Sequence, residues 1–313
     1  MQAVRRAVID VGTNSIKLLV AEVAGANVRP LCEESKQTRL GQGLYDTHQL
    51  QPGPLARTAA AVAAFAARAR QHQAASIRVI ATSAARDARN SQALTAAIET
   101  ASGLKVEIIS GDQEADWAFQ GVATDPRLAA TPLLLLDVGG GSTQFIVGQG
   151  THRPFRQSFP LGTVRLLERF PPSDPPTAAE LAACRQRLSQ FLEKEVAPAL
   201  APALRHDAGA DLLRLVGTGG TASILGCMEA RLETFDRERL EATRLSAERL
   251  AWHTQRLWSL PLEERKRLPG LPKNRADVIL TGAAIYEAVM RHFHFGELWI
   301  STRGLRFAAV MEG

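Results

Sequence analysis

Short apolar runs, each followed by a turn that contains glycine, open both halves of the chain. A run that ends at Ile9 and a run that begins at Ile16 flank a turn with Gly12. The same arrangement recurs around the glycines at 139–141. Two β-type runs joined by a tight glycine turn are typical of a β-hairpin. A third run follows each hairpin, over 28–34 and 154–159, so we expect each half to begin with a three-stranded meander.

Alternating helical and strand patterns follow each meander. In the first half we expect a helix over 55–70, a strand over 77–81, a helix over 92–101, a strand over 106–109 and a helix from Gln113. In the second half we expect helices over 178–196, a strand over 212–216, a helix from Thr221, helices over 247–258 and 276–292, and a strand over 298–301. The order βββαβαβα, repeated twice, predicts two α/β domains, each a mixed sheet covered by helices.

The two halves share more than their element order. The stretch Ile9–Ser15 is echoed 127 residues later by Leu136–Ser142, which has the same aspartate, valine and glycine after its apolar run. Internal repeats of this kind indicate two related structural units. We place the domains at 1–128 and 129–303, with a C-terminal helix over 304–313.

Composition narrows the class of protein. The chain has 313 residues, of which 45% are hydrophobic and 22% charged. No apolar stretch approaches the ~18 residues of a membrane-spanning helix, and the three cysteines lack the spacing of a disulfide framework or zinc site. Arginine outnumbers lysine 31 to 6, but the net charge of +5 is spread evenly. We therefore expect a cytoplasmic globular protein that has neither nucleic acid nor membrane as its main partner.

Three glycine turns at strand ends are the first candidate chemistry. Glycine lets backbone N–H groups approach an anion closely, and neighbouring hydroxyls add donors. Asp10 and Asp137 precede two of the turns, where a carboxylate can hold Mg²⁺ against phosphate oxygens. The alternative for both aspartates is an Asx-type turn cap. The turns comprise Gly12, Thr13, Asn14 and Ser15; Gly139, Gly140, Gly141, Ser142 and Thr143; and Gly217, Thr218, Gly219 and Gly220.

Glu114 is the second candidate. It follows a predicted strand at the start of a helix, where a carboxylate can align a water molecule for attack. The alternative is structural, because Ser110 and Gln113 fit a capping box and an acid in the first turn favours the helix dipole.

Together these motifs resemble the exopolyphosphatase/guanosine pentaphosphate phosphohydrolase (Ppx/GppA) family, within the actin-like ATPase and sugar-kinase superfamily. The matching segments run in the family's order along nearly the whole chain: 10–15, 81–90, 109–115, 136–143, 161–166, 217–221 and 275–279. The resemblance implies two actin-like (ribonuclease H-like) domains with the active cleft between them. It also implies the short form of the family, with a C-terminal helix that can pack back on the first domain.

The resemblance implies roles for particular residues. Glu114 matches the catalytic glutamate that positions or activates water, and Asp137 is expected to act in catalysis as well as in metal binding. Asp10 and residue 144 complete the expected metal positions. Backbone amides of the three turns would cradle the phosphates, and Arg86 falls near the phosphate chain. Arg267 and Arg275 are weaker candidates for distal phosphates, with a solvated basic helix edge as the alternative.

One position departs from the family pattern. The family continues Gly-Gly-Gly-Ser-Thr with glutamate, whereas this chain has Gln144. Glutamine retains an acceptor oxygen but loses the charge that a hard cation prefers. We expect this change to cost on the order of 10- to 1000-fold in rate, about 1–4 kcal/mol.

The expected reaction is Mg²⁺-dependent hydrolysis of the terminal phosphoanhydride of inorganic polyphosphate. Mn²⁺ is the alternative metal, and a monovalent cation is a possible further cofactor. One rival is the same chemistry on guanosine pentaphosphate, which would connect the chain to the stringent response. Another is a low-activity protein that binds polyphosphate or guanosine tetraphosphate, and a third is an ATP-dependent kinase or chaperone-like ATPase. The resemblance further implies a homodimer.

Overall fold

The computed structural model of the chain describes residues 2–206 and 213–312. Within these residues the contacts divide the chain into two units. The first unit holds the residues up to Asp125, together with Gly139–Gly141 and the residues from Arg303 onward; the second holds Pro126–Val138 and Ser142–Thr302. The first unit is therefore built from both ends of the described chain.

A five-stranded mixed sheet forms the centre of the first unit, in the order β3-β2-β1-β4-β5. β1, β2 and β3 are antiparallel neighbours, whereas β4 runs parallel to β1 and β5 parallel to β4. The expected meander and the two following strands are thus present. The strands of this sheet are β1 (Val4–Val11), β2 (Ser15–Ala24), β3 (Asn27–Gln37), β4 (Ser76–Ala81) and β5 (Val106–Ile108).

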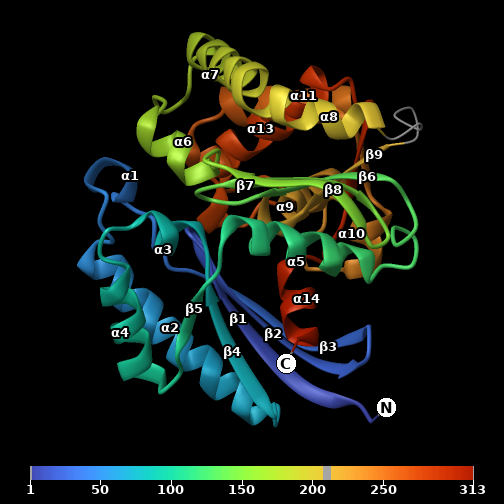
Figure 1. Ribbon diagram of the computed structural model, residues 1–313. Helices are drawn as coiled ribbons and strands as arrows, with labels where there is room; N and C mark the ends of the chain where they lie inside the picture. The colour runs from blue at the N-terminus through green and yellow to red at the C-terminus, as the bar shows by residue number, and fades with distance from the viewer. Residues whose placement is uncertain (1, 207–212, 313) are drawn as a thin grey trace. The chain divides into compact units, whose positions relative to one another are not determined.

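Helices cover both faces of this sheet (Figure 1). α2 packs on α4, β1 and β2, and α14 packs on α5, β1 and β2. α2 begins with Pro52 in its first turn, where a missing N–H costs nothing, and buries an alanine-rich face around Phe65. The helices are α1 (Leu44–Thr47), α2 (Pro52–Gln71), α3 (Ser83–Asp87), α4 (Ser91–Ser102), α5 (Gly111–Ala123) and α14 (Leu305–Met311).

The C-terminal helix α14 belongs to the first unit. Trp117 on α5 donates its indole N–H to a carboxylate oxygen of Glu312 at 2.7 Å, and Arg6 on β1 donates to the carbonyl of Met311 at 2.7 Å. Gly121 on α5 lies so close to the backbone of Gly304 that a Cβ at residue 121 would collide with it. The last residues of the described chain are therefore part of the first unit's packing.

A six-stranded mixed sheet, in the order β10-β11-β9-β6-β7-β8, forms the centre of the second unit. Its strands are β6 (Leu133–Val138), β7 (Thr143–Gln149), β8 (His152–Phe159), β9 (Arg214–Thr218), β10 (Arg244–Ser246) and β11 (Glu297–Ile300). α9 packs against β6, β9, β10 and β11, whereas α13 packs among α6, α7, α9 and α11. In Figure 1, α7, α8, α11 and α13 lie on one side of the sheet, and α9 and α10 lie on the other.

Most of the secondary-structure elements in this unit are helices. It comprises α6 (Thr163–Arg169), α7 (Ala178–Phe191), the π-helical turn η1 (Leu192–Val196), α8 (Ala197–His206), α9 (Gly219–Ala230), α10 (Arg237–Ala242), α11 (Ala247–Ser259), α12 (Leu262–Arg265), the 3₁₀ turn η3 (Lys273–Arg275) and α13 (Ile279–His292). α7 starts at a complete capping box, in which Thr177 and Glu180 satisfy each other's backbone N–H groups.

The second unit contains elements that the apolar pattern did not predict. α6, α10 and β10 are short, and β10 buries only Leu245 among its three residues. β10 forms because β11 offers an antiparallel edge with which it pairs, which a local pattern cannot reveal. The predicted strand over 212–216 corresponds to β9 at Arg214–Thr218, and residue 212 lies outside the described residues.

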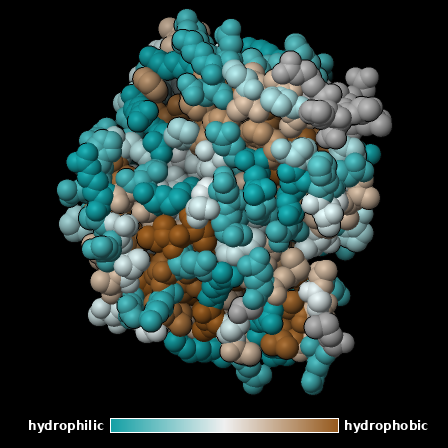
Figure 2. Space-filling view, viewed as in Figure 1, coloured by the Kyte–Doolittle hydropathy of each residue, from teal (hydrophilic) through white to brown (hydrophobic). Residues whose placement is uncertain are grey.

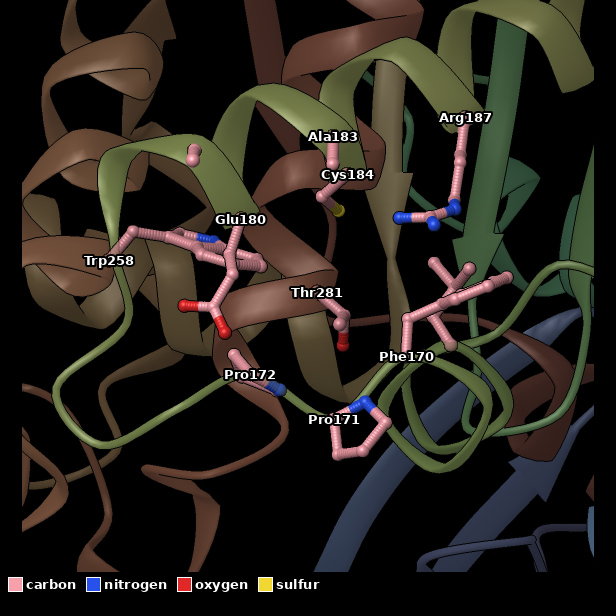
Figure 3. A pocket seen from close by; sticks show the side chains of 11 residues that line it. Phe170, Pro171, Pro172, Glu180, Ala183, Cys184, Arg187, Trp258 and Thr281 are labelled. Carbon is pink, nitrogen blue, oxygen red and sulfur yellow. The ribbon is translucent and has the colours of Figure 1, made fainter.

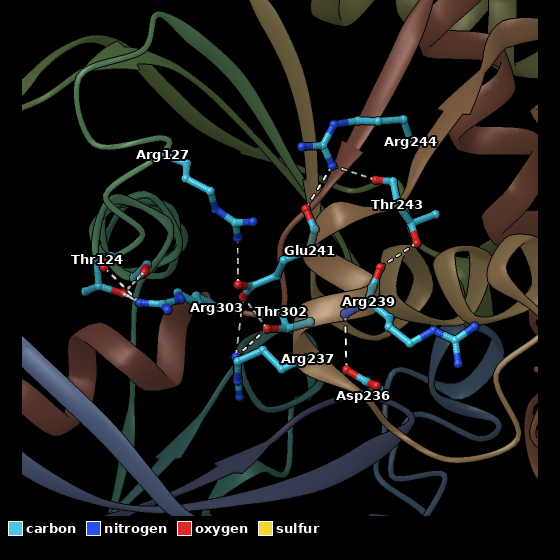
Figure 4. Close-up of polar contacts among 11 residues, drawn as sticks. Thr124, Arg127, Asp236, Arg237, Arg239, Glu241, Thr243, Arg244, Thr302 and Arg303 are labelled. Atoms are coloured by element: carbon cyan, nitrogen blue, oxygen red, sulfur yellow. Dashed lines mark hydrogen bonds and ion pairs between the residues drawn. The ribbon is translucent and has the colours of Figure 1, made fainter.

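Polar contacts hold the segments where the chain passes from one unit to the other. In the second unit, the buried Glu241 accepts hydrogen bonds from Arg127 at 2.8 Å and from Thr302 at 2.6 Å (Figure 4). In the first unit, Arg303 donates to the carbonyl of Thr124 at 2.8 Å. At the crossings next to Pro126 and Arg303, these contacts hold each segment within its own unit.

Most large apolar side chains of the described residues are buried in the cores of the two units. Figure 2 shows hydrophobic residues gathered over β4 and β5, where Ile108 is exposed, within a largely hydrophilic face. Among the described residues, none of the helices has the length and apolar character needed to span a bilayer.

Candidate active site

The first glycine turn is held by its own backbone and by the segment after β3. Gly12 donates its N–H to the carbonyl of Ser15 at 3.1 Å, and a Cβ on Gly12 would crowd that oxygen. The carbonyl of Asn14 accepts from the N–H groups of Thr38 and Arg39 at 3.2 and 2.9 Å. Because these carbonyls point into the protein and are satisfied there, the turn is a rigid element.

Three buried polar atoms beside this turn have no hydrogen-bond partner within the described part of the chain. They are the amide nitrogen of Asn14 and the hydroxyls of Ser15 and Thr38. The other side-chain atom of Asn14, its oxygen, accepts from Gln37 at 3.1 Å, which fixes the direction of the amide. Leaving a buried donor unsatisfied costs about 1–3 kcal/mol. Such a group of unused donors is what an anionic ligand would satisfy.

Asp10 lies directly opposite Lys17 in the antiparallel pair β1–β2. Directly opposite residues share one face of a sheet, so the ammonium group faces the carboxylate. Burial raises the pKa of Asp10, and the charges of Lys17 and Arg306 oppose that rise. The position is therefore a carboxylate whose charge is offset by lysine from its own sheet.

Glu114 and Arg86, two residues singled out from separate motifs, form an ion pair. Arg86 on α3 places its Nη1 2.7 Å from Oε2 of Glu114 in the first turn of α5. The same nitrogen donates to the carbonyl of Ile109 at 3.0 Å, at the end of the strand that leads to α5. Glu114 is only 9% exposed. The pair thus places a guanidinium against a nearly buried carboxylate at the start of the helix.

The capping interpretation of this segment also holds in part. Ser110 is the N-cap residue of α5, and its hydroxyl accepts from the N–H of Gln113 at 3.1 Å. Because Ser110 caps the helix, the carboxylate of Glu114 is not needed as a cap and pairs with Arg86 instead. The structural role of Ser110 and a chemical role of Glu114 are compatible.

In the second unit, one row of polar side chains crosses four neighbouring strands. Asp137 on β6 lies opposite Thr218 on β9 and Gln144 on β7, and Gln144 lies opposite Ser158 on β8. The amide nitrogen of Gln144 donates to the hydroxyls of Ser142 and Ser158, both at 3.0 Å. Because both amide protons are used there, the amide oxygen is the atom that Gln144 offers to a cation.

The third glycine turn joins β9 to α9. Gly219 has φ +81°, which a residue with a side chain rarely adopts, and a Cβ there would also collide with Oδ1 of Asp137. Thr221 donates its hydroxyl to the carbonyl of Val138 at 2.8 Å. The turn therefore presents the N-terminus of a 12-residue helix, which favours a bound anion, next to the Asp137 carboxylate.

The middle glycine turn is divided between the two units. Its glycines at 139–141 group with the first unit, where a Cβ on Gly141 would collide with the hydroxyls of Tyr45 and Ser83. In the second unit, the hydroxyl of Thr143 is buried and donates to the carbonyl of Leu161 at 2.6 Å. The Thr143 hydroxyl thus stabilises the fold of the second unit.

Arg267 stands apart from these groups. It is exposed just after α12, and within the described residues no contact joins it to a glycine turn of the second unit. Arg275 lies in η3 and is partly buried.

Sequence reasoning missed two neighbours of the candidate residues, Lys17 and Thr38. The two copies of the repeat are 127 residues apart, so they align Lys17 with Gln144 just as they align Asp10 with Asp137. This alignment could have identified Lys17 as a neighbour of Asp10. Register confirms this equivalence, since each aspartate faces the equivalent residue on the next strand. The first unit therefore has a cation where the second has an amide. Nothing in the local pattern points to Thr38.

No group of three or more histidine, cysteine, aspartate or glutamate side chains is placed to hold a metal ion, as far as the structure describes the chain. Mg²⁺ is commonly bound through one or two carboxylates, with water and substrate phosphates completing its shell. The row of Asp137 and Gln144 fits that pattern, because it supplies one carboxylate and one amide oxygen. Asp10 fits less well, because Lys17 faces it.

Comparisons with known proteins agree over nearly the whole chain. The model of the Ppx/GppA phosphatase family matches residues 19–311. The chain is 35% identical over 302 residues to exopolyphosphatase 2 of Mycobacterium tuberculosis. This alignment covers 93% of this chain and 91% of that protein. A crystal structure of the Aquifex aeolicus member of the Ppx/GppA family has a TM-score of 0.80 at 27% identity, covering 99% of this chain and 97% of the other. An exopolyphosphatase from Cytophaga hutchinsonii has a TM-score of 0.84 at 25% identity, covering 97% and 96%.

Proposed function

Because the chain belongs to the Ppx/GppA phosphatase family, we propose that it hydrolyses the terminal phosphoanhydride of inorganic polyphosphate and releases orthophosphate. Family membership makes the chain a hydrolase. The relative from Mycobacterium tuberculosis, which is named an exopolyphosphatase, supports polyphosphate as the substrate. The observation that carries the proposal is the nearly buried Glu114 carboxylate, which forms an ion pair with Arg86.

In this proposal Glu114 directs the attacking water. Phosphoryl transfer passes through a loose transition state, so the enzyme contributes positioning and charge stabilisation more than covalent chemistry. A carboxylate serves this purpose when its oxygens are fixed, since a misdirected water is not in line with the phosphorus. Arg86 is a positioning residue, because its contacts to Glu114 and to the Ile109 carbonyl fix the carboxylate relative to β5 and α5.

The glycine turns bind the phosphates. The unused donors of Asn14, Ser15 and Thr38 supply hydrogen bonds at the first turn, and the N-terminus of α9 supplies N–H groups at the third. Such donors stabilise charge in place, without reorganisation during the reaction.

Mg²⁺ is part of the same proposal. Asp137, with the amide oxygen of Gln144, would hold the ion, which when bound offsets the negative charge of the phosphates, whereas Lys17 opposes a cation at Asp10. Gln144 supplies a neutral ligand where a carboxylate would bind more strongly, so we expect turnover that is real but slow.

The decisive experiment measures orthophosphate released from long-chain polyphosphate, with Mg²⁺, by the wild-type chain and by Glu114→Gln. The amide keeps the size of the side chain but not its charge, and we expect a rate loss of at least ~100-fold, worth about 2.7 kcal/mol. Asp112→Asn is the matched control, because Asp112 is exposed in the same helical turn. Equal rates for the two variants would refute the role of Glu114.

The same assay separates the rival substrates. Specificity constants for polyphosphate, guanosine pentaphosphate and ATP are compared at one Mg²⁺ concentration. A higher value for guanosine pentaphosphate or ATP would replace polyphosphate as the substrate while leaving the role of Glu114 intact.

A further inference from the structure

The second unit contains a cavity that the proposed reaction does not use. It has a volume of about 380 Å³ and lies between the end of α6, the proline-rich loop after it, and α7. Small-molecule sites typically have volumes on the order of 300–1,000 Å³. Figure 3 shows Trp258 and Glu180 on one side, Phe170 and Arg187 on the other, and Cys184 and Thr281 between them.

The inner wall of this cavity is chemically apolar, although polar residues contribute to it. The indole N–H of Trp258 is used by the carbonyl of Leu280 at 3.1 Å, and the hydroxyl of Thr281 by the carbonyl of Thr163 at 2.9 Å. Burial raises the pKa of the Cys184 thiol to about 11, so the thiol is neutral at physiological pH. The two strong donors of this wall are therefore already used by backbone carbonyl groups.

The carboxylate of Glu180 is likewise occupied by its own loop. It accepts from the N–H of Thr177 at 2.7 Å, and from the N–H and the hydroxyl of Ser173, both at 2.8 Å. These bonds lower the pKa of Glu180 to about 2. The carboxylate shapes the loop that borders the cavity.

A second cavity, of about 340 Å³, adjoins the first and shares Leu166, Phe170 and Arg187 with it. Its lining has four cationic side chains and one carboxylate. These are Arg165, Arg169, Arg187, Lys194 and Glu195. Arg187 stacks over the ring of the exposed Phe170, with 4.1 Å from its Cζ to the ring centroid. Arg169, Arg187 and Lys194 have no carboxylate partner within 2–206 and 213–312.

An apolar cavity that opens beside unpaired cations is complementary to a ligand with a hydrocarbon chain and an anionic head. We propose that the second unit binds a single-chain amphiphilic anion, its chain in the cavity beside Trp258 and its head group against Arg187 and its neighbouring cations. A carboxylate and a phosphate monoester share this chemistry, and a guanidinium binds both through parallel N–H donors. The site is separate in its residues from those assigned to phosphate hydrolysis.

The test measures binding of dodecanoate and of dodecyl phosphate to the full-length chain by titration calorimetry, below the micelle concentration of each. Hexanoate has six fewer methylene groups, and at about 0.8 kcal/mol per buried methylene we expect its affinity to be at least ~100-fold lower. Uncharged dodecanol is expected to bind about tenfold more weakly than dodecanoate. Comparison of the two anions identifies the preferred head group.

Matched variants locate the site. Ala183→Trp fills the cavity and should weaken dodecanoate binding at least tenfold, whereas Ala182→Trp, at the exposed neighbouring position of α7, should leave it within twofold. Arg187→Glu should weaken it about tenfold, whereas Lys105→Glu, which reverses an exposed charge in the first unit, should not. Unchanged melting temperatures show that the variants are folded, and Arg187→Glu keeps the test valid if Ala183→Trp does not fold.

Three results would overturn the proposal. One is that Ala183→Trp and Arg187→Glu bind dodecanoate with the same affinity as the wild type. Another is tripolyphosphate binding that depends on Arg187 in the absence of any binding of dodecanoate, which would make this a site for phosphate chains. The third is a dimer of the wild type that Ala183→Trp dissociates, with no heat of dodecanoate binding, which would make the cavity a contact between two copies of the chain.

Discussion

Truncation of Arg86 should reduce catalysis and stability together, because its guanidinium fixes Glu114. Arg86→Ala removes the 2.7 Å ion pair to Glu114 and the 3.0 Å hydrogen bond to the Ile109 carbonyl. The Glu114 carboxylate then remains nearly buried without the cation that faced it. It will turn toward whatever water or donor is nearest, and the direction in which it holds a water molecule will be lost.

The magnitude follows from the burial of the pair. The side chains of Arg86 and Glu114 are 19% and 12% exposed. Exposed pairs contribute about 0.2–1 kcal/mol, and removing one partner of a fully buried pair costs about 3–5 kcal/mol. Between these limits we expect a loss of about 2–3 kcal/mol. At roughly 2–4 °C per kcal/mol, the melting temperature should fall by roughly 4–12 °C.

The catalytic effect should appear in kcat. A displacement of about 1 Å in a catalytic group can cost ~100-fold, so we expect a decrease of that order for Arg86→Ala, with a smaller change in KM. Arg86→Lys retains the charge but not the planar fork, and should recover part of the rate. Arg89→Ala removes an exposed arginine three residues further along and is the matched control.

A double-mutant cycle decides whether Arg86 acts through Glu114. In the Glu114→Ala background, Arg86→Ala should reduce kcat by no more than about twofold, because the carboxylate that it positions is absent. Orthophosphate release is measured well below the melting temperature of every variant. If the two losses in kcat multiply, or if Arg86→Ala matches Arg89→Ala in kcat while its melting temperature falls, the positioning argument is wrong.

Three other substitutions test separate parts of the structure. Gln144→Glu places a carboxylate opposite Asp137 and should raise Mg²⁺-dependent kcat on polyphosphate by about 10- to 1000-fold; an unchanged rate would mean that the amide is not limiting. Gly219→Ala adds a Cβ at positive φ against Asp137 and should lower the melting temperature by several degrees and abolish most of the activity, whereas a wild-type melting curve and rate would show that the turn adapts. Glu180→Gln tests a pH dependence. The pKa of Glu180 is lowered to about 2, so its stabilising effect is complete above its ordinary pKa and is lost as the pH falls toward 2. The difference in urea midpoint between wild type and this variant should shrink from pH 6 to pH 3, and a constant difference would contradict the loop contacts.

Much of the fold could be predicted because the two halves of the sequence contain the same motif and the same order of elements. The repeat of Ile9–Ser15 at Leu136–Ser142 places two equivalent hairpins, and the strand pairing aligns Asp10 and Asp137 in the same register. Agreement with solved structures of the Ppx/GppA family over nearly the whole chain confirms the fold class. β10 was missed because it depends on the edge of β11 and has one buried residue. The domain limits at 128 and 303 stay a prediction.

The candidate site was predictable residue by residue, but not in its contacts. Glu114 and Arg86 came from separate motifs, and their ion pair bridges 28 positions of the sequence, so a local pattern could not reveal it. Lys17 and Thr38 lie in ordinary strand patterns, and only the strand register and the neighbouring buried donors set them apart. The sequence reveals which chemical groups are available, whereas the cross-strand partners depend on the sheet.

The position of α14 has a consequence for the order in which the protein is made. β1 begins at Val4 and packs against a helix that begins at Leu305, so β1 is synthesised well before its partner. During translation the core cluster around Trp117 therefore lacks the side chains of α14 until the residues of the second unit have been synthesised. A stop codon shortly before Leu305 would leave α5, β1 and β2 without the helix that packs on them.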